Sequence, residues 1–187
     1  MIKGEVWLEK AYKTFAYEGP TGLKVERLAR EVGKSKSSFY HHFADLDVFT
    51  EHLLDYHYNM AIEMANREAN AKDVDELIEI IIEFKLDLLF NRQLRIHREN
   101  KDFEKCFCAI SAYSLPKLLG VWKKIIGLED QSYLAEMVLN LSIENFFLQI
   151  TDETINNNWL SNYFQNIKLM VAQFKKSNKN LELNDTV

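Results

Sequence analysis

The sequence predicts an all-α protein, and three observations support this prediction. The chain of 187 residues contains only two prolines and six glycines, so few residues interrupt helices. No stretch sustains the apolar–polar alternation of a half-buried strand, whereas apolar residues recur at helical spacing along most of the chain. Hydrophobic residues make up 47% of the sequence and aromatic residues 12%, which is ample for a core. A chain of this size fits one compact unit or a small head joined to a larger body.

The first predicted helix runs from about Lys3 to Glu18. It ends at Gly19 and Pro20, because glycine can adopt the conformation that terminates a helix and proline cannot continue it. The apolar stripe of this helix consists of Leu8, Ala11, Tyr12, Phe15 and Ala16.

Two short helices joined by a sharp turn are predicted over residues 25–43, VERLAREVGKSKSSFYHHF. Gly33 stands where the chain must leave a helix through a left-handed conformation, and Ser35 is a natural N-cap for the next helix. Helices this short must be held by neighbours. The arrangement is that of a helix-turn-helix, whose second helix enters the major groove of DNA. The expected core of this small head is Phe15, Leu28, Val32, Phe39 and Phe43.

A fourth helix is expected to begin at Asp45, its N-cap, and to run to about residue 69. No glycine or proline interrupts it, so a continuous helix rather than a flexible linker joins the head to the body. Asp73 and Glu76 are close to a capping box for a fifth helix that frays near Asn91. Residues 92–101 are polar and charged, and we assign them to a loop or a poorly anchored short helix.

The remaining helices are predicted from caps and interruptions. Asp102 is the expected cap of a helix that Pro116 interrupts, as a kink or as the first turn of a new helix, before Gly127 ends it. Asp130 is the expected cap of the penultimate helix. The last two helices carry apolar residues at a 3.5-residue repeat, which is typical of a bundle seam. These helices either form a four-helix interface with a second subunit or pack into the core of the monomer.

The distribution of charge is more informative than the net charge of −5. Residues 1–50 hold eight Lys/Arg and seven Asp/Glu, a net of +1, whereas the other 137 residues hold fifteen and twenty-one, a net of −6. A locally basic head on an acidic body is compatible with DNA binding. No apolar run could span a membrane and no secretory signal is present, so we expect a cytoplasmic protein. Cys106 and Cys108 lie on different sides of a helix and are not expected to form a disulfide.

The pattern Leu28-Ala29-x-x-x-Gly33-x-Ser35-x-x-x-Phe39-Tyr40-x-His42-Phe43 resembles the head of the tetracycline-repressor (TetR) family of transcriptional regulators. The resemblance implies a homodimer that binds a two-fold-related DNA operator, a small-molecule pocket in each body, and release of DNA when ligand binds. Three positions depart from the family pattern. Lys24 replaces a threonine that caps the second helix, Ser37 replaces a common glycine, and Leu46 replaces a lysine that often contacts phosphate.

The resemblance also implies which residues bind DNA. Lys36 is the only long charged donor on the exposed part of the second helix, so we expect it to contact guanine O6 or N7. Tyr40 and His42 match positions that reach the phosphate backbone. The predicted DNA-binding set is Lys24, Lys34, Ser35, Lys36, Ser37, Ser38, Tyr40, His41 and His42.

Two further sets of residues are predicted in the body. An aromatic effector pocket is predicted from residues that could equally be ordinary core: Phe84, Phe103, Phe107, Tyr113, Trp122 and Phe147. The predicted dimer interface consists of Leu134, Val138, Leu141, Leu148, Leu160, Phe164, Ile167, Val171 and Phe174. The predicted domains are therefore a DNA-binding head (residues 1–45), an effector-binding and dimerisation body (46–176) and a disordered tail (177–187).

Other functions have less support. The histidines show no zinc-ligand spacing, and no nucleotide-binding or nucleophile motif occurs, so we expect no metal, no cofactor and no enzymatic activity. The second hypothesis is a protein-interaction module that keeps this fold but has a weakened DNA-binding face. The changes at Lys24 and Leu46 favour that alternative, whereas Lys36, Tyr40 and His42 favour DNA binding.

Overall fold

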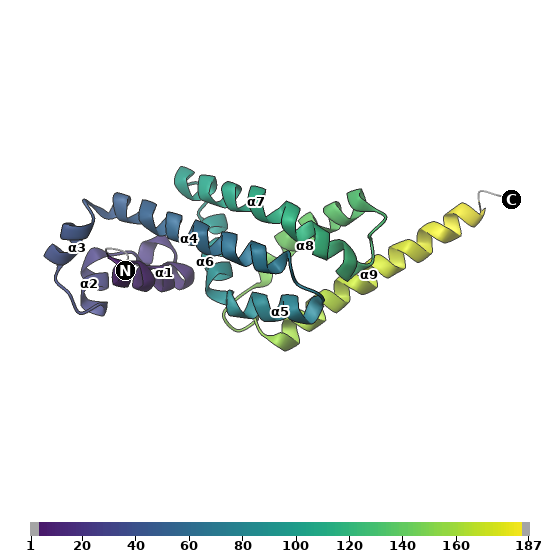
Figure 1. The fold of residues 1–187 in the computed structure, drawn as a ribbon, viewed down its shortest axis with the longest axis horizontal. Helices are drawn as coiled ribbons and strands as arrows, with labels where there is room; N and C mark the ends of the chain where they lie inside the picture. Colours follow the sequence, from purple (N-terminus) through teal and green to yellow (C-terminus); the bar gives the residue numbers. More distant parts are fainter. Residues whose placement is uncertain (1–3, 185–187) are drawn as a thin grey trace. The chain divides into compact units, whose positions relative to one another are not determined.

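The computed structural model describes residues 4–184, with side chains described for residues 4–176. All regular structure in this part of the chain is helical, which confirms the predicted all-α fold. No helix among the described residues is long and apolar enough to cross a membrane. The helices, labelled in Figure 1, are α1 (Glu5–Glu18), the short 3-10 helix η1 (Pro20–Gly22), α2 (Val25–Glu31), α3 (Lys36–His42), α4 (Leu46–Glu68), α5 (Val74–Glu83), α6 (Lys85–Ile96), α7 (Lys101–Ile126), α8 (Ser132–Gln149) and α9 (Asn157–Asn184).

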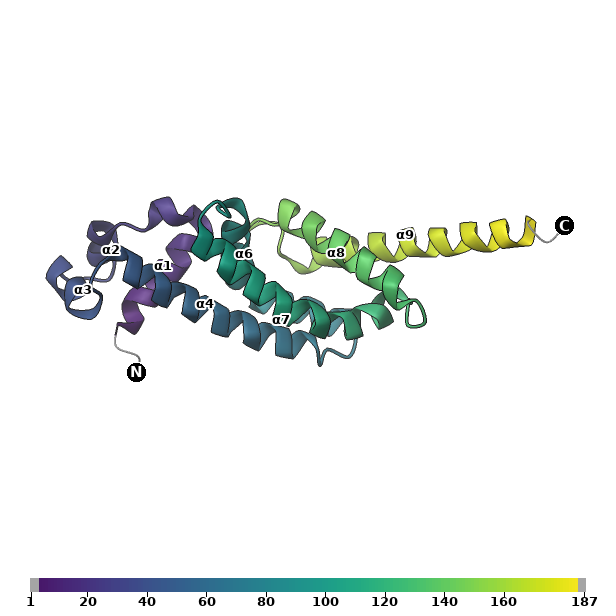
Figure 2. The same cartoon turned by 90° about the horizontal axis from the view of Figure 1, so that it is seen from above.

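The chain forms two compact units. The first comprises Met1–Asn66 and Glu83–Leu115, and the second comprises Arg67–Ile82 and Pro116–Val187. Within the first unit, α1, α2 and α3 gather at the N-terminal end of α4, as both views show (Figures 1 and 2). The predicted division at residue 45 concerns function and stays a prediction. Helix α9 continues to Asn184, through most of the segment predicted as a disordered tail, and residues 185–187 lie outside the described residues.

Local capping determines where the helices of the head begin and end. Gly33 has φ +68°, the left-handed conformation that ends α2. Ser35 Oγ accepts a hydrogen bond from the N–H of Ser38 at 3.2 Å and so caps α3. Asp45 Oδ1 accepts from the N–H of Val48 at 2.8 Å at the start of α4. The predicted turn and both predicted caps are confirmed.

The core of the head is centred on Phe39 of α3. The Phe39 ring makes edge-on contacts with Trp7 of α1, with ring centroids 5.3 Å apart, and with Phe49 of α4 at 5.1 Å. Phe43 packs against Phe39 at 5.3 Å, and Leu28 of α2 is fully buried. Trp7, which the apolar stripe predicted from sequence omitted, therefore joins α3 to α1. Aromatic pairs of this geometry add to the stability that burial alone supplies.

Helix α1 also packs on α6 and α7, through Phe15 and Tyr12. Phe15 was expected in the head core, but its ring stacks on Phe90 at 4.2 Å and meets Phe103 edge-on at 5.4 Å. Tyr12 stacks on the same Phe90 ring at 4.6 Å. Helix α1 thus has one set of residues in the core of the head and another set in the contact with α6 and α7. The head is not an independent three-helix unit.

The end of α1 lies very close to α6. Gly19 has φ +67°, and a Cβ atom there would lie 2.9 Å from both Gln93 Oε1 and His97 Nε2. Gln93 Nε2 also donates to the carbonyl oxygen of Ala16 at 3.4 Å. The predicted helix stop at Gly19 is confirmed, and the structure adds a second reason for glycine, because a side chain would collide with α6.

A buried polar triad links α1, α4 and α6. The Tyr12 hydroxyl donates to Asp87 Oδ1 at 2.5 Å and lies 2.7 Å from His57 Nδ1. Since the Tyr12 proton is directed to Asp87, we infer that Nδ1–H of a neutral His57 donates to the Tyr12 oxygen. His57 Nε2 is buried without a hydrogen-bond partner. Burial lowers the pKa of His57 to about 3, and burial raises the pKa of Asp87 above its ordinary value.

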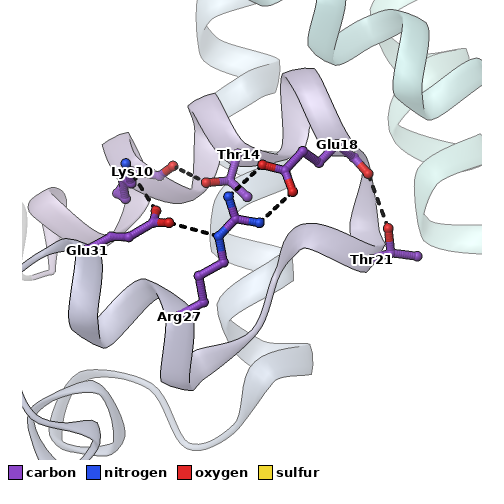
Figure 3. A network of polar contacts seen from close by, with 6 residues as sticks. All are labelled: Lys10, Thr14, Glu18, Thr21, Arg27 and Glu31. Carbon is purple, nitrogen blue, oxygen red and sulfur yellow. Dashed lines mark hydrogen bonds and ion pairs between the residues drawn. The ribbon is translucent and has the colours of Figure 1, made fainter.

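On the exposed side of the head, Arg27 connects α2 to α1 (Figure 3). Its guanidinium donates to both carboxylate oxygens of Glu18, at 2.5 and 2.6 Å, and its Nε donates to Glu31 at 2.8 Å. Glu31 also pairs with Lys10 of α1 at 3.0 Å. The hydrogen bonds from Arg27 lower the pKa of the Glu18 and Glu31 carboxyls. A bidentate guanidinium–carboxylate pair fixes orientation as well as distance.

Several predicted boundaries in the body were wrong. The helix predicted from Asp73 to Asn91 breaks at Phe84, and α6 then continues to Ile96, because Gln93 and Leu94 are buried and anchor the segment that was assigned to a loop.

The caps of the next two helices also differ. Asn100, rather than Asp102, caps α7, since Asn100 Oδ1 accepts from the N–H groups of Asp102 and Phe103 at 2.9 and 3.3 Å. Helix α7 continues through Pro116, so no new helix starts there. Gln131 rather than Asp130 occupies the N-cap of α8.

The second unit is held by contacts among the end of α7, α8 and α9. Trp122 Nε1 donates to the carbonyl oxygen of Ala135 at 3.1 Å, and the Trp122 ring packs on Phe164 at 6.3 Å. Tyr163 donates to the carbonyl oxygen of Ser142 at 2.5 Å. Gly127 has φ +68° and ends α7, which confirms the predicted stop.

We expect His57 to make stability depend on pH. Its pKa in the folded state, about 3, lies below the value of about 6.5 in an unfolded chain, so the unfolded state binds the proton first as pH falls. Stability therefore decreases from about pH 6.5 towards pH 3, by about 1.4 kcal/mol per pH unit from this group. Asp87, whose folded pKa is raised, acts in the opposite direction as its carboxyl takes up a proton.

The variant His57→Asn isolates the histidine, because asparagine can still bond Tyr12 but does not titrate. Chemical denaturation at pH 7 and pH 5 should show that the variant is less stable at pH 7 and that the difference narrows at pH 5. A difference that is the same at both pH values would contradict the assignment.

Arg27→Lys should lower the melting temperature by a few degrees, because lysine cannot make the bidentate bond to Glu18 while it also bonds Glu31. The effect should shrink at high salt, since the network is exposed. Thermal unfolding at low and high salt checks this, with Arg30→Lys as the matched control on the same helix. Equal effects of the two substitutions would contradict a role for the bidentate geometry.

Candidate nucleic-acid interface

Helix α3 has one buried side and one exposed side. Phe39 is fully buried, whereas Ser37, Tyr40, His41 and His42 are exposed. Tyr40 is 54% exposed and its ring meets Phe39 edge-on at 5.4 Å, so the residue contacts the core of the head and is still accessible from outside. The sequence therefore places hydrogen-bonding side chains on the outer side of the second helix of the helix-turn-helix.

The turn before α3 contributes a second group of exposed residues. Lys34, Ser35 and Lys36 are exposed, and Ser38 is half-buried with its N–H bonded to Ser35. The structure thus brings Lys34 to Ser38 together at the N-terminal end of α3. Such an end carries free N–H groups and a positive dipole, which favour phosphate.

Lys24 lies at the N-cap of α2. Its backbone is extended, its side chain is exposed, and no side-chain hydrogen bond caps the helix. The presence of lysine where the family has threonine predicted that this helix would lack a side-chain cap, and the structure agrees. Lys24 can act towards phosphate only as a point charge.

Lys36 makes an ion pair that the sequence reasoning missed. Lys36 Nζ lies 2.6 Å from Oε1 of Glu26, a residue in the first turn of α2. The hydrogen bond from Lys36 lowers the pKa of the Glu26 carboxyl, which stays ionised at neutral pH. The two residues are ten positions apart and meet only because the turn at Gly33 folds α3 back beside α2. The sequence did offer one indication of this pair, because Glu26 and Lys36 carry opposite charges on the two helices of the helix-turn-helix.

The positive charge available to DNA is consequently smaller than the sequence count suggested. Of the five basic residues between positions 24 and 42, Arg27 is paired with Glu18 and Glu31, and Lys36 is paired with Glu26. The other three are exposed and make no ion pair within the described residues; they are Lys24, Arg30 and Lys34.

The six residues of the predicted effector pocket lie in both units and are described separately. In the first unit, Phe84 and Phe103 are buried and Phe107 lies under the Arg95 guanidinium at 4.5 Å. Tyr113 there donates to Asn66 Oδ1 at 3.0 Å. In the second unit, Trp122 is buried against Phe164, and Phe147 meets Phe146 edge-on at 5.5 Å. Phe103 and Trp122 thus have core partners, and a pocket at any of the six stays a prediction.

The nine residues of the predicted dimer interface separate by burial. Five are already buried in the single chain: Val138, Leu160, Phe164, Ile167 and Val171. Leu134 is half-buried. Leu141, Leu148 and Phe174 are 69%, 80% and 58% exposed. Further exposed apolar side chains on α8 and α9 are Tyr133, Met137, Leu169 and Met170.

The two cysteines are both free. Cys106 Sγ lies 3.9 Å from the carbonyl oxygen of Leu54, and burial raises the pKa of its thiol to about 12. A thiol with such a pKa stays protonated at neutral pH and is a poor nucleophile. Cys108 is exposed, with Sγ 3.8 Å from Glu104 Oε1.

Comparison with known proteins supports the interpretation of the head. Residues 8–47 match the family model described as bacterial regulatory proteins, tetR family. This segment extends from Leu8 in α1, through the helix-turn-helix, to the start of α4. No curated protein matches the sequence.

Two solved structures have a similar fold. One is a proposed transcriptional regulator, SCO7518, from Streptomyces coelicolor A3(2), with a TM-score of 0.56, 15% identity, and 90% of this chain and 98% of that chain covered. The other is a proposed TetR-family transcriptional regulator from Mesorhizobium loti MAFF303099, with a TM-score of 0.59, 14% identity, and 92% and 94% covered. The head of this chain, residues 8–47, is therefore similar in sequence to bacterial regulatory proteins of the tetR family, and the chain has the fold of these two solved structures.

Proposed function

We propose that this protein is a ligand-responsive repressor that binds a two-fold symmetric DNA operator as a homodimer and is released by a small molecule. It acts in the cytoplasm, without a cofactor and without catalytic activity. The observation that carries this proposal is the division of α3 into a side buried on Phe39 and a side that presents Ser37, Tyr40, His41 and His42. A helix held rigidly on one side and polar on the other suits insertion into a major groove.

Phosphate contacts position such a head, and base contacts determine its sequence preference. We expect phosphate contacts from four exposed residues: Lys24, Lys34, Tyr40 and His42. Ser35, Ser37 and Ser38 are too short for a bidentate contact with a base, and suit phosphate or water-mediated contacts. Lys36 has the reach and the donors for guanine O6 or N7.

Dimerisation is proposed through the exposed apolar side chains of α8 and α9. Tyr133, Met137 and Leu141 are four residues apart along α8 and share one helix face. Exposed apolar side chains that gather on one surface commonly mark an interaction site. This set replaces the buried residues of the sequence-based prediction as the proposed contact with the partner.

Ligand in the body would shift α4 of each subunit and so change the distance between the two recognition helices. Successive major grooves are separated by about 34–36 Å, so a small shift is enough to reduce affinity for an operator. Helix α4 is continuous over Leu46–Glu68, which is the property that a rigid connection requires.

The alternative is a protein-interaction module with a weakened DNA-binding face. The Glu26–Lys36 pair favours it, since this pair places a carboxylate beside the principal base-reading side chain. Selection of binding sites from random DNA, followed by affinity measurements across salt concentrations, decides between the two. A two-fold symmetric site with a steep salt dependence supports the repressor, and no enriched sequence at any salt concentration supports the module.

Lys36→Ala should relax the preference for one base pair in each half-site, at a cost of about 1–3 kcal/mol for the preferred base. The measurement is a repeat of the site selection with the variant. Lys34→Ala is the matched control, since loss of a phosphate contact should weaken binding to all sequences alike. An unchanged preferred sequence for Lys36→Ala would refute its role as a base reader.

Leu141→Glu should convert the dimer to a monomer, because it places a charge in the proposed apolar contact on α8. Analytical ultracentrifugation measures the mass of the wild type and the variant. Ile96→Glu is the control, since Ile96 is also exposed, at 49%, but lies on α6 in the first unit. A variant that remains dimeric would place the interface elsewhere.

A further inference from the structure

The Glu26–Lys36 pair joins the two helices of the helix-turn-helix at the end that approaches DNA. Glu26 is in the first turn of α2, Lys36 is the first residue of α3, and their side chains are 67% and 55% exposed. The pair is separate from the network of Arg27, which joins α1 to α2.

The fold does not depend on this pair. The end of α2 is determined by Gly33, and the start of α3 by the Ser35 cap. Phe39 anchors α3 in the core. Exposed ion pairs add little to stability, because water already solvates both charges well and two long side chains must be ordered. A stability role is therefore a poor explanation for Glu26.

The Glu26 carboxylate limits which groups Lys36 can contact. It lies at the start of α3, because it pairs with Lys36, the first residue of that helix. Its contact occupies one of the three N–H donors of Lys36. Two donors remain, which is enough for a contact with guanine O6 and N7.

We propose that Glu26 is a specificity-determining residue, which holds the Lys36 ammonium beside the base edges and keeps it away from phosphate. The inference rests on the proposed function, since it requires that α3 enter the major groove. In complexes with non-specific DNA, Glu26 prevents Lys36 from gaining a phosphate contact. On the operator, Glu26 lowers affinity only slightly, because Lys36 contacts a base there and not a phosphate. Glu26 therefore lowers non-specific affinity more than operator affinity.

The test is Glu26→Gln, which keeps the size of the side chain and removes its charge. Each phosphate contact contributes about 0.9 to the slope of log affinity against log salt, so the variant should show a slope on random DNA steeper by about one. Its non-specific affinity should rise about 10-fold, whereas operator affinity should change about 2-fold or less. The preference for the base that Lys36 contacts should weaken.

Glu9→Gln is the matched control, because Glu9 is an exposed acid on α1 and its substitution changes the net charge equally. Fluorescence anisotropy on the selected operator and on a random duplex, at several salt concentrations between about 50 and 200 mM, measures all affinities. Equal effects of Glu26→Gln and Glu9→Gln would overturn the proposal, since net charge alone would then account for them.

The double variant Lys36→Ala, Glu26→Gln separates an action through Lys36 from direct repulsion. In the Lys36→Ala background, Glu26→Gln should raise non-specific affinity no more than Glu9→Gln does. A full 10-fold increase there would overturn the proposal. If the protein is not a DNA-binding repressor, the result is different from all of these, because the wild type would then select no DNA sequence at all.

Discussion

The contact of α1 with α6 is the interaction on which the head depends. Tyr12 and Phe15 of α1 both stack on the ring of Phe90 in α6, with centroids 4.6 and 4.2 Å away. A head of about 43 residues buries too little apolar surface to be stable alone. By packing on Phe90, α1 gives the head a second core. The contact between Trp7 and Phe39 connects α1 to the core of the head itself. The orientation of the recognition helix therefore follows from residues that lie outside the helix-turn-helix.

Features governed by neighbouring residues could be predicted from the sequence. The turn at Gly33, the cap at Ser35 and the stop at Gly127 depend on backbone conformations and N–H groups within a few residues, and the structure has each of them. The recognition of the head as helix-turn-helix rests on the same local chemistry. The exposed and buried sides of α3 followed from helical periodicity in the same way.

Features governed by distant partners could not be predicted. The Tyr12–His57–Asp87 triad joins residues that are 45 and 75 positions apart, and a polar residue on an apolar stripe does not identify its partner. Phe15 has the spacing of a head-core residue, yet its neighbours are Phe90 and Phe103. The dimer-interface residues stay a prediction for a related reason: a 3.5-residue repeat marks a packed seam, but does not tell whether its partner lies in the same chain.

The head combines two kinds of contact with different sensitivities to solvent. The aromatic core and the buried triad are shielded from salt, whereas the Arg27 network and the Glu26–Lys36 pair are exposed and screened by it. The ion pair of Arg27 with Glu18 connects α2 to α1, so these charges help to hold the fold. Glu26 and Lys36 take no part in these contacts and join the first turn of α2 to the start of α3. The charges of Glu26 and Lys36 can therefore change while the packing that orients α3 stays intact.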